Sequence, residues 1–199
     1  YHDANDGGRN QLFRNDGAWK FVEATEQAGL EVNNARHSLA AAWEDYDNDG
    51  DQDLYIANDY GKNCLYRNDG GRFSQVAERA GAVDYGSGMS VSWADYDRDG
   101  WMDLYVGNMF SSAGSRITSQ ENFLPQSKHP VRALYRRFVR GNSCFRNGGD
   151  GTFSETSDRS GATTAGWAWS SVFTDLDNDG WEDLFVANGY ITTPDTGDL

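Results

Sequence analysis

The chain carries three copies of a short acidic motif whose residues could bind a cation. The copies read DYDNDGDQDL from Asp45, DYDRDGWMDL from Asp95 and DLDNDGWEDL from Asp175. Each copy places four aspartates within nine residues, around a glycine that permits a sharp bend. Carboxylates gathered in this way supply the oxygen ligands that hard divalent cations prefer. The motif therefore predicts three cation sites of one design.

Calcium fits this ligand set best, because it takes about six to eight oxygens in a flexible arrangement. Magnesium demands a tighter octahedron that tolerates so many carboxylates poorly, and zinc would need His or Cys ligands. We predict side-chain ligands at positions 1, 3, 5 and 9 of each loop and a backbone carbonyl at position 7. The predicted calcium ligands are Asp45, Asp47, Asp49, Asp51 and Asp53 in the first loop, Asp95, Asp97, Asp99, Trp101 and Asp103 in the second, and Asp175, Asp177, Asp179, Trp181 and Asp183 in the third.

Each loop begins like an EF-hand, but position 12 is Ile56, Val106 or Val186 where an EF-hand has a bidentate Glu. The residues that follow each loop also favour a strand over a helix. We therefore expect each loop to join two strands. Solvated acidic turns without metal are the alternative, since Asp, Asn and Gly are common turn residues. Three copies with Asp at all four positions favour calcium.

Two further elements recur around the acidic loops. A small apolar segment ending in an aromatic residue precedes each loop, and a hairpin of the form [LC]-[FY]-R-N with a Gly-containing turn follows the first two loops. Together they give four short strands in about 50 residues, which is typical of a propeller blade. The preceding segments are Ser38–Asp45, Gly88–Asp95 and Ala168–Asp175, and the hairpins start at Asn10, Asn63 and Asn142.

The sequence starts and stops within a repeat. It starts with a hairpin and stops after a strand that follows an acidic loop. Ala4-Asn5-Asp6 matches Ala57-Asn58-Asp59, so the start corresponds to the end of such a strand. Closed propellers use about four to eight blades. We therefore expect residues 1–199 to be about three to four blades of a longer propeller. In the alternative, neighbouring molecules complete each other's open blade and form homo-oligomers or filaments.

Residues 109–140 have a different composition and are predicted to be a partly helical insertion. They contain six basic residues and a single acid, Glu121. Pro130 is suited to open a helix, and Val131, Leu134, Tyr135 and Phe138 then form an apolar stripe. One interpretation packs this stripe on the blade edge with the arginines in solvent. The other is a basic arm that binds a partner or bridges subunits.

The alternation of these elements resembles FG-GAP/VCBS repeats, which build the β-propeller of integrin α subunits and many bacterial surface proteins. With its final run VANGYITTPDTGDL, the chain is most similar to bacterial relatives of cartilage acidic protein, which commonly carry an ASPIC/UnbV domain. The resemblance implies an all-β, seven-bladed propeller with calcium in the acidic loops. It also implies an extracellular, cell-surface or periplasmic setting.

Charge and composition narrow the function further. The net charge is −14, with 31 acidic against 17 basic residues, which argues against nucleic acid as a partner. No apolar run approaches the ~20 residues that would span a bilayer, and we expect any signal peptide to have been cleaved or to lie outside this sequence. We expect a non-enzymatic module for adhesion, protein interaction or extracellular structure, with a protein or glycan partner.

A carbohydrate-binding or polysaccharide-degrading protein is the alternative function. The sequence offers little catalytic chemistry, because His2, His37 and His129 lie in unrelated contexts and no nucleophile motif occurs. Tryptophans could stack on sugars, and Trp101 and Trp181 are predicted to be exposed. Trp43 and Trp93 share a repeat position with Phe173 and are predicted to be core.

The two cysteines, Cys64 and Cys144, fall at adjacent registers of the same repeated strand. Their side chains are therefore expected on opposite faces. We expect buried free thiols rather than a disulfide between them.

Overall fold

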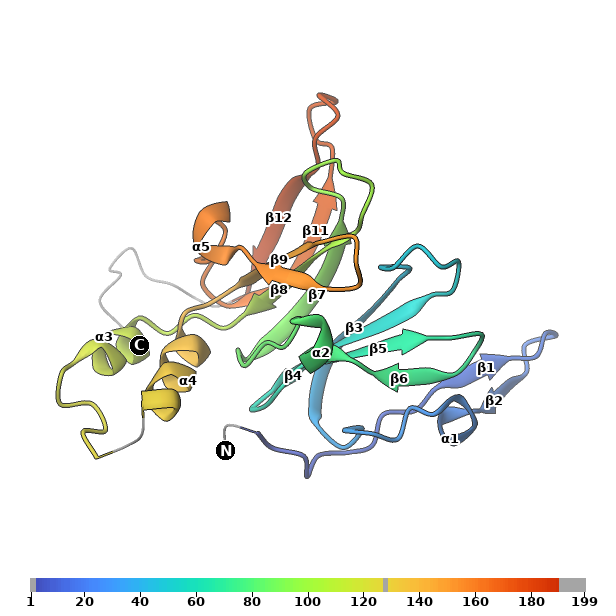
Figure 1. The fold of residues 1–199 in the computed structure, drawn as a ribbon, viewed down its shortest axis with the longest axis horizontal. Coiled ribbons are helices and arrows are strands. Elements are labelled where there is room, and N and C mark those ends of the chain that lie inside the picture. The colour runs from blue at the N-terminus through green and yellow to red at the C-terminus, as the bar shows by residue number, and fades with distance from the viewer. Residues whose placement is uncertain (1–2, 127–128, 190–199) are drawn as a thin grey trace.

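The computed structural model describes residues 3–126 and 129–189. Over these residues the chain forms four antiparallel sheets that follow one another in chain order (Figure 1). Two sheets have four strands each and two have two. The strands are β1 (Phe13–Asn15) and β2 (Phe21–Glu23); β3 (His37–Glu44), β4 (Asp53–Asp59), β5 (Cys64–Asn68) and β6 (Phe73–Gln75); β7 (Gly88–Ala94), β8 (Asp103–Asn108), β9 (Ser143–Asn147) and β10 (Phe153–Glu155); and β11 (Ala168–Thr174) and β12 (Asp183–Asn188).

The predicted order of strands and loops is confirmed. Each acidic loop joins two strands, namely β3 to β4, β7 to β8 and β11 to β12, and no helix of the described residues flanks it. The repeats also share their register, since Trp43 pairs with Leu54 and Trp93 with Leu104 at matching positions. The described residues therefore hold three loop-joined strand pairs and three hairpins, and, as expected, they begin with a hairpin and end with a loop-joined pair.

A single helical turn follows each hairpin and turns the chain toward the next sheet. These turns are α1 (Thr25–Ala28), α2 (Ala77–Ala80) and α5 (Ser157–Ser160). The first two end at Gly29 and Gly81, whose φ angles of 84° and 71° close a helix without the strain that a Cβ would add.

The main core lies between the two four-stranded sheets. Strands β3 and β4 contact β7, so one face of the first sheet packs on the second. Large side chains from both sheets, including Tyr55, Leu65, Leu104 and Phe145, are buried there. A smaller apolar cluster joins α1 to the opposite face of the first sheet.

The tryptophans at matching repeat positions differ in burial. Trp93 packs between the sheets, stacked on Tyr46 at 6.5 Å between ring centroids and edge-on to Tyr55. Trp43 is 45% exposed, so the prediction that it belongs to the core is wrong for this chain. The reason is its position in the stack of sheets, because within residues 3–126 and 129–189 no loop-joined strand pair covers β3 as β3 and β4 cover β7. Phe173 is half-buried and contacts Tyr105.

The insertion is partly helical, as predicted, with α3 (Ser112–Ser119) and α4 (His129–Val139). A bridge between Phe110 and Arg140 closes its base. The two helices pack on each other, and the rings of Phe123 and Tyr135 meet at 5.7 Å between centroids. Figure 1 places both helices on the side of the molecule away from the acidic loops.

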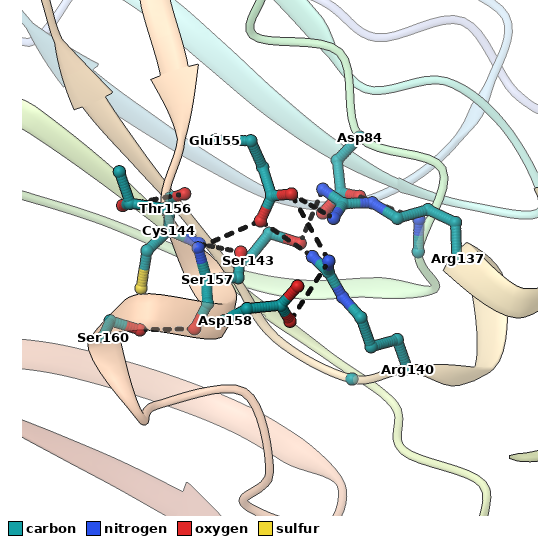
Figure 2. A network of polar contacts seen from close by, with 12 residues as sticks. Asp84, Arg137, Arg140, Ser143, Cys144, Glu155, Thr156, Ser157, Asp158 and Ser160 are labelled. Carbon is teal, nitrogen blue, oxygen red and sulfur yellow. Dashed lines mark hydrogen bonds and ion pairs between the residues drawn. The ribbon is translucent and has the colours of Figure 1, made fainter.

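The prediction that the arginines of the insertion lie in solvent is wrong for Arg137 and Arg140. The carboxylate of Asp84 is fully buried and accepts hydrogen bonds from Nε of Arg137 (3.1 Å) and Nδ2 of Asn108 (2.8 Å). Both arginines also pair with Glu155 of β10, as Figure 2 shows. The insertion is therefore held to the sheets by charge pairs.

Both cysteines are buried and unpaired, as expected. Cys64 lies in β5 and Cys144 in β9, which belong to different sheets. Burial raises the pKa of both thiols, so they are poor nucleophiles at neutral pH.

Candidate metal centres

The three acidic loops have the same place in their sheets. Each starts directly after its first strand and ends where Asp53, Asp103 or Asp183 begins the next strand. This shared connection explains why the same spacing recurs, since the strand pair fixes both ends of the loop. The last aspartate of the first two loops is fully buried, whereas Asp183 is exposed.

The backbone of each loop bends twice into the left-handed region. The fourth and sixth residues have positive φ in every copy. The sixth residue is glycine, which adopts this conformation without steric cost, and the fourth is Asn or Arg. The residues and angles are Asn48 (57°), Gly50 (93°), Arg98 (60°), Gly100 (88°), Asn178 (62°) and Gly180 (85°).

Backbone N–H groups then hold the first carboxylate in place. Asp45 accepts from the N–H of Asp49 at 3.1 Å and from that of Gly50 at 2.9 Å. The same two bonds form at Asp95, at 2.9 and 2.8 Å, and at Asp175, at 3.1 and 3.0 Å. These bonds curl the loop around its carboxylates.

The seventh residues, predicted to contribute carbonyls, share a second contact. Asp51, Trp101 and Trp181 each donate their N–H to the carboxylate at position 5, at 2.9, 3.0 and 2.8 Å. The side chain of Asp51 accepts from the N–H of Gly70 instead of pointing to the cluster. That arrangement leaves only its carbonyl for the predicted role.

The structure brings three of the four predicted carboxylates of each loop together. One oxygen from each of the three lies within 4.8 Å of the others. The fourth predicted carboxylate, which is Asp49, Asp103 or Asp183, lies outside this grouping. The grouped residues are Asp45, Asp47 and Asp53, then Asp95, Asp97 and Asp99, then Asp175, Asp177 and Asp179.

Buried carboxylate oxygens without a hydrogen-bond partner indicate whether the loops are suited to bind a cation. Oδ1 of Asp47, Oδ1 of Asp97 and Oδ2 of Asp103 are buried and have no hydrogen-bond partner. Two of these atoms occupy the same position in successive loops. A buried carboxylate oxygen without a donor is costly, and a bound cation would compensate it. The residues of the first two loops therefore fit a hard divalent cation, and the third loop repeats their spacing.

Electrostatics support the same conclusion. Burial raises the pKa of Asp53 to about 7, although the N–H of Asn68 lowers it, and the charge of Asp47 adds to the rise. Burial likewise raises the pKa of Asp103 to about 7, with Asp97 adding to the rise. A protein that buries several anions together disfavours their charge unless a cation offsets it.

Two contacts that were not predicted join neighbouring loops. Nδ2 of Asn48 donates to the carbonyl of Gly100 at 3.2 Å. The guanidinium of Arg98 lies over the ring of Trp181, 5.2 Å from its centroid. Both contacts are made by the side chain of the fourth residue of a loop. The residue type at this variable position is therefore the sequence feature that could have indicated them. Trp181 is 49% exposed as predicted, whereas Trp101 is half-buried.

Repeated antiparallel sheets joined by aspartate loops define a β-repeat protein with candidate cation sites. Residues 45–106 and 134–186, together more than half of the chain, match the FG-GAP-like repeat. The chain therefore belongs to the FG-GAP repeat family, whose members are typically extracellular or periplasmic. A comparison with curated proteins gave no match. Among the described residues, no helix has both the length and the apolar character to span a membrane.

Proposed function

We propose that this chain is a calcium-stabilised, non-enzymatic β-propeller segment that works outside the cytoplasm in adhesion, protein interaction or extracellular structure. The observation that carries the proposal is the threefold recurrence of one loop with clustered carboxylates, two copies of which hold buried carboxylate oxygens without a hydrogen-bond partner. A ligand set that recurs at the same structural position in every repeat serves the fold of each repeat. Calcium would be held by the aspartates of the loops and would offset their repulsion.

The propeller is supported by the way successive sheets pack. Each four-stranded sheet follows chain order, and strands β3, β7 and β11 contact one another in sequence. We propose that further blades, seven in the resemblance noted above, continue this stack. The finer likeness to bacterial relatives of cartilage acidic protein belongs to the same proposal. So does completion of the two-stranded sheets by neighbouring copies.

Thermal unfolding tests structural calcium. With excess calcium we expect a melting temperature well above that in a calcium-selective chelator, because ligands that bind only the folded state stabilise it by mass action. At a free concentration of 100 times Kd, each site adds about 2.7 kcal/mol. Magnesium at the same concentration is the control and should restore less. An identical melting curve in chelator and in calcium contradicts the proposal.

Carbohydrate binding is the second candidate, and exposed tryptophans favour it. Trp181 is 49% exposed at an acidic loop, and Trp19 is 96% exposed at a hairpin tip. The exposed parts of both rings could stack on sugars, although Arg98 lies over the ring of Trp181. A glycan array compares the chain with Trp181→Ala and Trp19→Ala. Binding that either variant abolishes supports this function, and absence of binding at calcium saturation favours a protein partner.

A further inference from the structure

The second acidic loop is ion-paired with a guanidinium, whereas no such ion pair is formed by the first loop among the described residues. Arg146 of β9 donates through Nε to Oδ2 of Asp97 and through Nη2 to Oδ2 of Asp99, the latter at 2.6 Å. Both aspartates are candidate calcium ligands. The guanidinium thus offsets negative charge at the site where a cation would act.

The corresponding arginine of the first four-stranded sheet is directed elsewhere. Arg67 lies in β5 one residue after Tyr66, which pairs with Leu54, as Arg146 follows Phe145, which pairs with Leu104. Its guanidinium binds Asp69 at 2.8 Å; its charge also acts on Asp47, but among the described residues it makes no ion pair with the first acidic loop. Arg14 of β1 makes the same local pair with Asp16, at 2.8 Å.

One hairpin residue accounts for the difference. The first two hairpins read R-N-D-G, so an aspartate two residues after the arginine captures it. The third reads R-N-G-G-D-G, which puts Gly148 where Asp16 and Asp69 stand. Without that carboxylate, Arg146 turns to the nearest remaining anions, which are those of the acidic loop.

We propose that Arg146 is an internal counter-ion that competes with calcium, so that the second loop binds calcium more weakly than the first. This inference rests on the proposed calcium function. In the absence of the ion, Arg146 offsets repulsion between Asp97 and Asp99, and a bound divalent cation must act against its charge. Binding is still possible, because Oδ1 of Asp97 and Oδ2 of Asp103 remain without a partner, and the side chain of Asp103 is fully buried.

Site-resolved NMR titration measures the effect. The N–H groups of Gly50 and Gly100 donate to the first carboxylate of their own loops, so their amide resonances report each site separately. In the unmodified chain, titrated with calcium against a competing chelator, Gly50 should reach its midpoint at a lower free calcium concentration than Gly100. Arg146→Gln should lower the Gly100 midpoint by about threefold to tenfold and leave the Gly50 midpoint unchanged.

Two further variants separate charge from structure. Arg146→Lys keeps the positive charge and should keep the Gly100 midpoint close to that of the unmodified chain. Asp69→Gly removes the carboxylate that holds Arg67 and should raise the Gly50 midpoint. Adding Arg67→Gln to Asp69→Gly should then restore the Gly50 midpoint.

The outcomes distinguish the two proposals. An Arg146→Gln variant whose Gly100 midpoint is unchanged or raised overturns the counter-ion role, while calcium binding itself stands. An Asp69→Gly variant with an unchanged Gly50 midpoint overturns the role of the hairpin residue. Glycine amides that do not respond to calcium in any variant overturn the proposed function together with this inference.

Discussion

The two four-stranded sheets and the sheet of β11 and β12 share one strand sequence, but its residues are buried in the first two and largely exposed in the third. Tyr55 of β4 and Tyr105 of β8 are fully buried, whereas Phe185, at the same position of β12, is 64% exposed. Tyr46 of the first acidic loop is buried, and Leu176 of the third is 77% exposed. The repeat sequence therefore specifies the strand and its register, while the neighbouring sheet determines burial, as expected for arrays stabilised by nearest-neighbour contacts.

Truncating the matched aromatic residues should cost several kcal/mol more in the four-stranded sheets than in the sheet of β11 and β12. Tyr55→Ala removes a fully buried ring whose hydroxyl donates to the carbonyl of Ala82, and should cost about 3–5 kcal/mol. Phe185→Ala removes an exposed ring and should cost about 0.5 kcal/mol. Urea denaturation of both variants checks this. Equal losses would mean that Phe185 is covered in solution and that the comparison fails.

A second test concerns the ion pair between the insertion and the buried Asp84, and its expected effect is smaller. Arg137→Met leaves the buried carboxylate of Asp84 without its cationic partner and should cost about 3 kcal/mol. Arg136→Met, one residue earlier on α4, loses only a bond to the carbonyl of Thr118 and should cost less than about 1 kcal/mol. Thermal unfolding of the pair measures the difference. Similar losses would show that Asp84 is not held by the insertion.

A charge introduced at the exposed third acidic loop should change the free energy of unfolding least. Leu176→Glu places a carboxylate at a solvent-exposed position, so the free energy of unfolding should change by no more than about 0.5 kcal/mol. Tyr46→Glu at the matching inner position should unfold the chain, because it buries a charge between two sheets. Circular dichroism follows both variants. A folded Tyr46→Glu variant would contradict the packing described here.

Much of the fold could be predicted from the sequence, because the spacing of Asp45–Asp53 and its two copies fixes where strands begin and end. The order of the strand pairs could be predicted from the same repeats. The helical insertion could be predicted because it interrupts them. The exposure of Trp43 could not be predicted, since burial there would need a further strand pair, which the described part of the chain does not place beside β3. The contacts of Arg137 with Asp84 were also missed, because 53 residues separate them and no local pattern marks the pair.

Part of the candidate site could also be predicted, namely which aspartates of a loop lie together. The clustering of Asp45, Asp47 and Asp53 follows from loop spacing alone. The position of Arg146 depends on a strand that is distant in sequence and on the missing carboxylate at Gly148. Comparison of the three hairpins shows that replacement, but only the folded sheet shows which anions the arginine then meets.

Counting bound calcium ions tests whether each acidic loop holds one ion. Native mass spectrometry of the chain in excess calcium should show three ions per chain, one for each acidic loop, and Asp47→Asn should reduce the count to two. Asp59→Asn, which changes an aspartate at the far end of β4, is the matched control and should keep three. A chain that binds no calcium, or an Asp47→Asn variant that still binds three ions, would contradict the account.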